Sequence, residues 1–140
     1  MLAITKEFKW EAAHRISNHA GECRNLHGHS YKLFVTLSAE SLNASDMIID
    51  FKELKTIIET QVLKKFDHAL LLKQNEANKN LIKLIDDQPV VWLPFEPTVE
   101  RMLLVIKDLI EPELPYNITL WALKLYETPS SFGEWKTDKN

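Results

Sequence analysis

Two stretches of the sequence alternate between apolar and polar residues, and a polar loop separates them. From Ile4 to His14 every second position is mostly apolar, and His14 shares the parity of those apolar residues. The alternation resumes at His29, which shares the parity of the apolar side chains that follow it. A period of two is typical of half-buried β-strands. We therefore expect two strands in hairpin-like order, joined by the loop 15–28.

Two longer segments have helical periodicity instead. Residues 50–66 begin with Asp50 and, three residues later, Glu53, which resembles a capping box. Apolar residues then recur on one stripe, as on a helix that packs against a sheet. Residues 97–110 have Thr98 as the expected N-cap and an acidic residue in the first turn. Both segments are predicted to be helices.

Shorter elements are expected between and after these helices. Asn78–Asp86 is predicted to be a short helix, and the PVVWLPF segment to be briefly extended. A last strand is expected over Ile118–Thr128, and a further edge strand over Ser45–Ile49 stays open. The tail from Ser130 is expected to fray at its end. Two early strands followed by helices favour an α+β fold with an antiparallel sheet and helices on one face.

Composition excludes several classes of protein. A chain of 140 residues with 45% apolar and 26% charged residues predicts one globular domain over residues 1–140. The net charge of −3 and the scattered cations disfavour nucleic acid as a partner. The apolar runs are too short for a membrane span, and the N-terminus lacks a signal-peptide pattern. Cys23 has no second cysteine with which to form an intrachain disulfide, so a cytoplasmic location is expected.

Three histidines have the spacing of a metal site. His27 and His29 form a His-x-His pair, and a period of two directs both rings to one face of a strand. His14 ends the preceding strand and would face this pair across an antiparallel hairpin. Such a pair alone arises often by chance, but a third histidine at the expected strand end favours zinc. Three imidazoles leave one coordination position open for water or substrate.

Cys23 lies four residues before His27 and has three interpretations. Its thiolate would serve as a fourth zinc ligand in a closed structural site. Alternatively, cationic neighbours would lower its pKa and make it a base beside the metal. A buried, inert thiol is the third interpretation, which its polar neighbours disfavour.

Three acidic residues and one further histidine are candidates for the chemistry. Asp67 precedes His68, and a carboxylate beside an imidazole can support acid–base chemistry, although such a histidine often only caps a helix. Glu127 lies on an apolar parity of the last strand, so it is paired, neutral or reserved for a ligand such as a guanidine-like ring edge. Glu100 fits a simple helix-dipole role.

Several short motifs, taken in their order, resemble the 6-pyruvoyltetrahydropterin synthase/6-carboxytetrahydropterin synthase family. They are FKWEAAHR, CRNLHGHSY, MIIDFKELK, FDHALL, PTVE and YET. The resemblance covers roughly residues 4–68 and 97–128. The short spacing between the cysteine and His-Gly-His, together with IIDF, resembles the bacterial 6-carboxytetrahydropterin synthases. Residues 73–96 are expected to be a surface insertion that leaves the site unchanged.

The resemblance assigns roles to the candidate residues. It implies a zinc ion with three protein ligands, namely His14, His27 and His29. It implies that Cys23 accepts a proton and that Asp67 and His68 complete a catalytic relay. It also implies that Glu127 anchors a pterin ring, with Glu100 nearby in the pocket.

The resemblance also implies a fold, an assembly and a reaction. The fold is the T-fold, a four-stranded antiparallel sheet with two helices packed on one face. The assembly is a homohexamer of two stacked trimers, with sites at subunit interfaces. The reaction is a zinc-dependent carbon–carbon lyase step in queuosine biosynthesis, from 7,8-dihydroneopterin triphosphate to 6-carboxy-5,6,7,8-tetrahydropterin, acetaldehyde and triphosphate.

Two other functions stay open on the sequence. The first is the same fold with a pyruvoyl product or a related pterin, such as sepiapterin, as substrate. The second is a zinc-stabilised binding module with a Cys-His₃ site and no catalysis. Thiolate ligation of the metal would favour the second function, and turnover of a pterin would exclude it.

Overall fold

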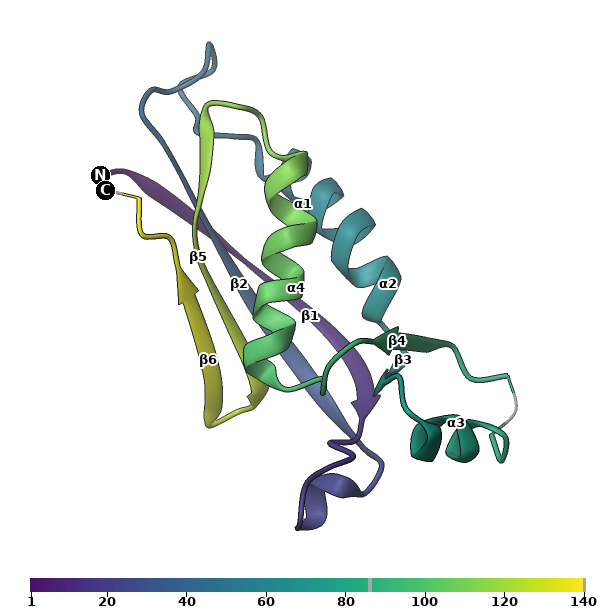
Figure 1. The fold of residues 1–140 in the computed structure, drawn as a ribbon. Coiled ribbons are helices and arrows are strands. Elements are labelled where there is room, and N and C mark those ends of the chain that lie inside the picture. Colours follow the sequence, from purple (N-terminus) through teal and green to yellow (C-terminus); the bar gives the residue numbers. More distant parts are fainter. Residues whose placement is uncertain (86, 140) are drawn as a thin grey trace.

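The computed structural model describes residues 1–85 and 87–139 of the chain (Figure 1). The strands are β1 Ala3–His14, β2 His27–Ala39, β3 Ala69–Lys73, β4 Val90–Leu93, β5 Ile118–Thr128 and β6 Ser131–Lys136. The α-helices are α1 Phe51–Ile58, α2 Lys64–Phe66, α3 Glu76–Ile82 and α4 Val99–Ile110. A π-helical turn, η2 Glu59–Leu63, and two 3₁₀ turns, η1 Glu22–Arg24 and η3 Glu111–Glu113, complete the elements.

One mixed sheet contains all six strands in the order β4-β3-β1-β2-β5-β6. Strands β1, β2, β5 and β6 pair antiparallel, whereas β3 runs parallel to both β1 and β4. The α+β class is confirmed. The prediction of four antiparallel strands is wrong, both in the number of strands and in the directions of β3 and β4.

The two kinds of missed strand have different physical causes. β3 is a continuous apolar run with four successive buried residues, and such a run has no period of two to detect. β6 lies in the tail from Ser130, for which no strand was predicted. Its side chains are mostly exposed, so they give little apolar alternation to detect, yet it pairs with β5 from Ala122 to Thr128. Residues 73–96 are likewise more than a surface insertion, since they supply β4.

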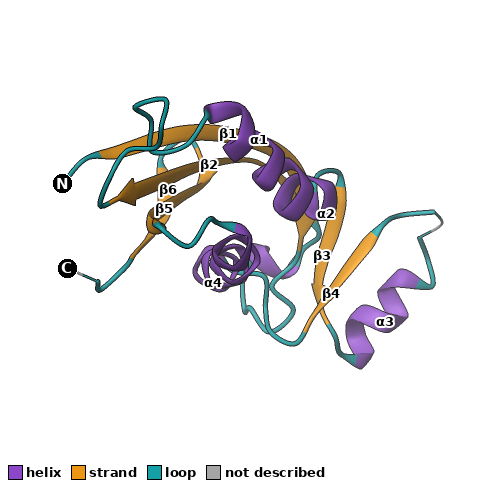
Figure 2. Cartoon of the chain, turned by 90° about the horizontal axis from the view of Figure 1, so that it is seen from above, coloured by secondary structure: helices purple, strands orange, loops and turns teal. Residues whose placement is uncertain are grey.

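Two helices cover the same face of the curved sheet (Figure 2). The first is continuous through α1, η2 and α2, and the second is α4. Their buried side chains belong to the same core as those of the sheet: Leu54, Ile58, Val62, Phe66, Met102, Leu103, Ile106 and Ile110. In the described residues, no helix has the length and apolarity that a membrane span requires.

The starts of both helices agree with their predicted N-caps. The Asp50 carboxylate accepts a hydrogen bond from Lys52 N at 2.8 Å, and the Thr98 hydroxyl accepts one from Arg101 N at 3.3 Å. Each cap satisfies an amide that the first turn of the helix leaves free. The Thr98 cap matters for function because it fixes where the chain turns from residue 97 into α4.

Two shorter predictions differ from the structure. Residues 45–49 form turns and not an edge strand, because the Asn43 side chain accepts hydrogen bonds from Ser45 N and Met47 N. Helix α3 begins two residues before the predicted Asn78, because Asn75 is its N-cap. Asp86, the predicted end of that helix, lies outside the described residues.

Candidate functional site

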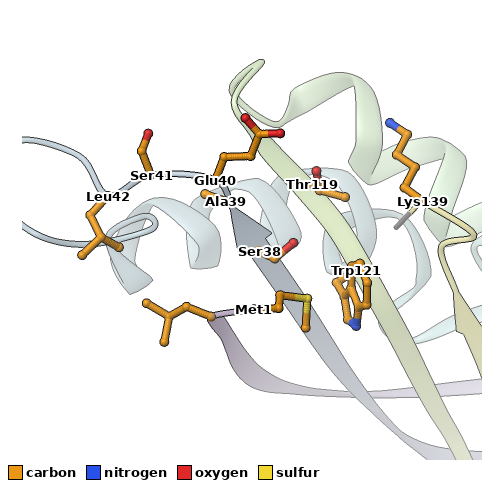
Figure 3. A pocket seen from close by; sticks show the side chains of 10 residues that line it. Met1, Ser38, Ala39, Glu40, Ser41, Leu42, Thr119, Trp121 and Lys139 are labelled. Carbon is orange, nitrogen blue, oxygen red and sulfur yellow. The ribbon is translucent and has the colours of Figure 1, made fainter.

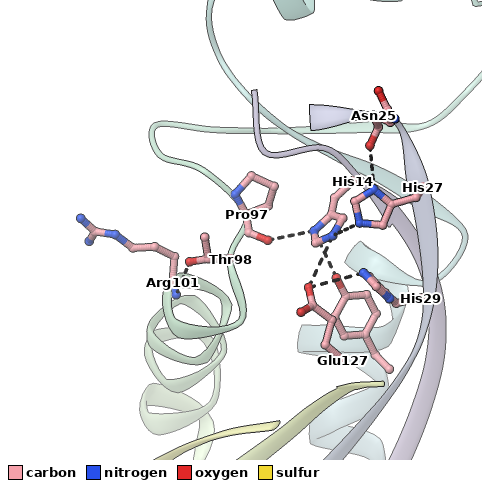
Figure 4. Close-up of polar contacts among 9 residues, drawn as sticks. His14, Asn25, His27, His29, Pro97, Thr98, Arg101 and Glu127 are labelled. Atoms are coloured by element: carbon pink, nitrogen blue, oxygen red, sulfur yellow. Dashed lines mark hydrogen bonds and ion pairs between the residues drawn. The ribbon is translucent and has the colours of Figure 1, made fainter. Parts of the chain in front are cut away.

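The register of β1 and β2 brings three histidines together. His14 pairs with His27, and Ala12 pairs with His29, across the antiparallel ladder. Directly opposed residues point to the same face of a sheet, here the face that carries the helices. One ring nitrogen from each histidine lies within 4.8 Å of the others (Figure 4). The three rings meet edge to face, with centroids 4.7 to 4.9 Å apart.

Main-chain carbonyls orient two of the three rings. His14 Nδ1 lies 3.0 Å from the carbonyl oxygen of Pro97, and His27 Nδ1 lies 2.6 Å from that of Asn25 (Figure 4). A carbonyl only accepts hydrogen bonds, so each Nδ1 must carry the proton. Each neutral ring then presents the lone pair of Nε2 to the centre of the cluster.

These two lone pairs face one another. His14 Nε2 and His27 Nε2 are 3.1 Å apart, and with both protons on Nδ1 neither atom has a hydrogen to donate. A proton or a cation between them would relieve the repulsion. Burial lowers the pKa of His14 to about 4, and the neighbouring His27 and His29 act in the same direction. A proton is therefore disfavoured at neutral pH, and a metal ion fits the cluster.

The electrostatics of His29 also disfavour a proton in the cluster. Burial, followed by the proximity of His27, lowers the pKa of His29. The hydrogen bond to Pro97 and the charge of Glu96 oppose the shift at His14 without cancelling it. Neutral imidazole is the form that binds a metal, so the lowered pKa values of His14 and His29 favour metal binding.

Glu127 approaches the cluster from β5. Its Oε1 lies 3.4 Å from His14 Nε2 and 3.6 Å from His29 Nε2. Burial raises the pKa of Glu127; His27 opposes the shift, and Glu100 adds to it. A half-buried carboxylate beside neutral imidazoles is the group that the last strand was expected to reserve for a ligand.

A hollow of about 400 Å³ begins at this carboxylate. Glu127 and His29 line it together with two cations, Lys9 and Lys32. A larger hollow of about 500 Å³ lies at the opposite end of the strands, beside Trp121 and both chain termini (Figure 3). None of the three clustered histidines lines this larger hollow, so its size alone does not make it the site.

Cys23 lies in η1, beside the cluster. Its side chain is exposed, and it lines a hollow with Asn25 and His27. The main chain here is tied to the end of β1, because Ile16 N donates to Cys23 O at 2.8 Å. The group of convergent ligand atoms in the described residues contains the three histidines and not the thiol. The thiol therefore lies outside the group of atoms that could hold a metal ion.

Asp67 and His68 form a pair of their own. Asp67 Oδ1 accepts from Glu11 N at 3.1 Å and lies 2.9 Å from His68 Nδ1. His68 has a φ of 60°, and its side chain is 79% exposed. It lines a hollow with Glu11 and Ser30, whose parity is opposite to that of the histidine cluster. His29 of the cluster also lines this hollow, so the two groups of side chains meet there.

The whole chain matches a known family of enzymes. The sequence model of 6-pyruvoyl tetrahydropterin synthase matches residues 3–138. The chain belongs to this family. The expectation from the short motifs is confirmed, and the chain is an enzyme.

Two relatives that match over nearly their full length have the name of the 6-carboxy branch of the family. A 6-carboxy-5,6,7,8-tetrahydropterin synthase from Haemophilus influenzae is 34% identical, with 97% of this chain and 99% of the relative covered. A protein of the same name from Rickettsia conorii is 33% identical, with 96% and 99% covered. These relatives support the bacterial branch that the cysteine spacing favoured.

Solved structures support the fold of the family. An uncharacterized protein from Wolinella succinogenes has a TM-score of 0.80 at 20% identity, with 98% of each chain covered. The 6-pyruvoyl tetrahydropterin synthase of Plasmodium falciparum has a TM-score of 0.73 at 18% identity, with 97% of each chain covered. At this identity the likeness shows the fold alone.

The structure also adds residues of this family member that the sequence did not single out. The carbonyls of Asn25 and Pro97 set the ring tautomers, yet every residue has a carbonyl, so no residue type signals that role. Tyr31, whose hydroxyl lies 3.4 Å from His14 Nδ1, was expected only as an apolar strand residue. Its position two residues after His29 on the same parity was the available signal. Glu100 lies exposed on the first turn of α4.

Proposed function

We propose that this enzyme converts 7,8-dihydroneopterin triphosphate, with uptake of water, to 6-carboxy-5,6,7,8-tetrahydropterin, acetaldehyde and triphosphate, in queuosine biosynthesis. The names of the near relatives support the reaction. The observation that carries the proposal is the pair of Nε2 lone pairs of His14 and His27, 3.1 Å apart beside the Glu127 carboxylate. This arrangement suits a metal and a pterin ring side by side.

The proposed metal is zinc, held by His14, His27 and His29. Neutral imidazoles are usual zinc ligands, and three of them leave a position for substrate. When bound, zinc supplies Lewis-acid polarisation of the hydroxyl groups of the substrate side chain. The protein's own contribution is the fixed tautomer of two rings, which aims their nitrogens before any ion arrives.

Glu127 is the proposed anchor of the pterin. A carboxylate can accept two parallel N–H bonds from the guanidine-like edge of the ring, which fixes orientation as well as position. Its place between the histidines and the 400 Å³ hollow directs the substrate side chain toward the cluster. Such positioning places the reacting carbon within reach of a base. We assign Glu100 to the surroundings of this anchor because its charge acts on Glu127.

Cys23 is the proposed base. As a thiolate it removes a proton from a carbon of the substrate side chain, and the shared hollow with His27 supports this assignment. We propose that His68, held by Asp67, returns or relays the proton. The 2.9 Å contact between them keeps one nitrogen of His68 occupied and leaves the other free for the substrate.

The exposure of the Asp67 and His68 side chains supports an assembly. We propose a homohexamer of two stacked trimers in which Asp67 and His68 of one subunit complete the site of another. The exposed His68 side chain and the two outer strands of the sheet, β4 and β6, leave groups that a neighbouring subunit would cover. Each chain is proposed to enter this assembly as a single domain.

Product analysis tests the reaction. Zinc-loaded enzyme is incubated with 7,8-dihydroneopterin triphosphate, and mass spectrometry follows the pterin and the released aldehyde. We expect 6-carboxy-5,6,7,8-tetrahydropterin with equal acetaldehyde from the native chain, and zinc retention without turnover from Cys23→Ala. A pyruvoyl product would move the assignment to the other branch of the family. Full turnover by Cys23→Ala would remove the thiol from the mechanism.

A further inference from the structure

A second polar cluster lies next to the histidines and has no part in the reaction described above. Ser17 N donates to Glu96 Oε2 at 2.9 Å, and the Ser17 hydroxyl donates to Glu96 Oε1. Asn75 Nδ2 donates to the same hydroxyl oxygen at 2.9 Å. We call these three residues the Ser17 clamp. The direction of its bonds is fixed, because the hydroxyl proton must point to the carboxylate.

The Ser17 clamp joins the two chain segments that orient His14. Ser17 follows His14 by three residues, at the point where β1 has ended. Glu96 directly precedes Pro97, whose carbonyl accepts the Nδ1 proton of His14 at 3.0 Å. The clamp and the ring contact therefore connect the same two segments. The clamp does so through Glu96, and the ring contact does so through the next residue, Pro97.

The clamp is also strong for its size. Both oxygens of one carboxylate accept from a single residue, and hydrogen bonds to a charged acceptor are about twice as strong as neutral ones. Asn75 fixes a third segment, because its Oδ1 caps α3 by accepting from Asn78 N at 2.8 Å. The Pro97 carbonyl is thus fixed by its two neighbours along the chain. Glu96 is hydrogen-bonded to Ser17, and Thr98 caps the start of α4.

We propose that Ser17 and Glu96 are positioning residues for the metal site, because they hold the Pro97 carbonyl on His14 and so aim His14 Nε2 at the other ligands. The inference rests on the metal site of the proposed function. Neither residue touches the ion or the substrate. Their effect passes through one main-chain carbonyl, so it is expected in metal affinity and in the ring of His14.

A purely structural role makes a different prediction, and Asn78 supplies the control. Asn78 is fully buried, and its Nδ2 donates to Lys73 O at 2.7 Å. Asn78→Ala therefore lowers stability in the neighbourhood of the clamp without removing any of the clamp's side chains. A change that follows from general destabilisation will appear in this variant too.

Zinc affinity is the first measurement, made by competition with a chromophoric chelator. Glu96→Ala is expected to bind zinc about 10-fold to 100-fold more weakly, as is typical when a group that orients a metal-bound histidine is lost. Ser17→Ala keeps the main-chain bond to Glu96, so its zinc affinity should lie between those of Glu96→Ala and the native chain. Ser17→Thr keeps the hydroxyl and should bind zinc as tightly as the native chain. Asn78→Ala should bind zinc normally at a lower melting temperature.

The second measurement uses metal-free protein and separates this inference from the proposed function. The Nδ1 proton of His14 is followed by NMR in ¹⁵N-histidine-labelled chains. It should be protected in the native chain and in Asn78→Ala, but exchange rapidly in Glu96→Ala and at an intermediate rate in Ser17→Ala. An unchanged Nδ1 proton in both clamp variants would overturn the inference. A native chain that binds no zinc would instead overturn the proposed function and leave this result standing.

Discussion

At the scale of single residues, His14 is the most constrained group of the site. Its side chain is almost fully buried, and the rings of His27, His29 and Tyr31 surround it. Burial and the Glu127 charge raise the pKa of Tyr31, so its hydroxyl stays neutral beside the imidazole. The ring therefore has one donor aimed at a carbonyl and one lone pair aimed at the cluster, with little room to rotate.

Loss of one ligand should abolish metal binding without unfolding the chain. His27→Ala removes a half-exposed imidazole and its lone pair, which leaves two ligands for the ion. We expect zinc content near zero by elemental analysis and a melting temperature close to that of the native metal-free protein. His19→Ala removes an exposed histidine from the loop that precedes β2 and should keep one zinc per chain. Stoichiometric zinc in His27→Ala would refute the ligand set.

The histidine cluster could be predicted from the sequence, because side chains alternate between the two faces of a β-strand. His14, His27 and His29 share a face by a period of two, and the hairpin register then closes the cluster. The surroundings were not readable in the same way. The role of Pro97 depends on the path of its main chain, and the outward side chain of His68 depends on a φ of 60°.

At the scale of elements, α4 connects the core to the site. Its N-terminus follows the peptide that contacts His14, and its buried face packs on the sheet. The helix and the three long strands, β1, β2 and β5, show clear periods, which is why their positions were predicted. β3 is a buried apolar run, and β6 is a short strand with mostly exposed side chains. Neither has a clear period of its own, and both depend on pairing with other strands, which a local sequence pattern does not contain.

The two faces of α4 should respond differently to truncation. Ile106 is fully buried, whereas Leu104 is 44% exposed on the same helix. Ile106→Ala is expected to lower the free energy of unfolding by about 2–5 kcal/mol, through lost burial and a residual cavity. Leu104→Ala should change it by about 0.5 kcal/mol or less. Urea unfolding of both variants, without zinc, measures this difference, and equal effects would contradict the assigned packing.

At the scale of the whole molecule, the catalytic candidates form two groups on the sheet. The histidines and Glu127 form one group, and Asp67 with His68 forms the other, beside a hollow that His29 also lines. The mixed topology produces this arrangement, because β3 runs parallel to β1 and leaves Asp67 and His68 beside the main chain of Glu11. In the proposed assembly a complete site would draw on two chains, and no periodicity within one chain indicates which groups come from a neighbour.

Mixing two inactive variants should restore activity if the site is shared. Cys23→Ala and His68→Ala each lack one group, but in a mixed assembly some sites draw Cys23 from one chain and His68 from another. Random mixing predicts about a quarter of native activity. Light scattering should give an assembly of six times the 16.3 kDa chain mass. Mixed hexamers without activity would place both groups within a single chain.

The carbonyl contacts of His14 and His27 have a consequence for mutation. A substitution at Asn25 replaces its side chain but keeps the oxygen that receives the His27 proton, because that oxygen belongs to the backbone. The orientation of the ligands is thus encoded in the course of the chain and tolerates changes of residue type there. Diverging sequences can drift at such positions while the chemistry is inherited, and a search for invariant side chains would pass over them.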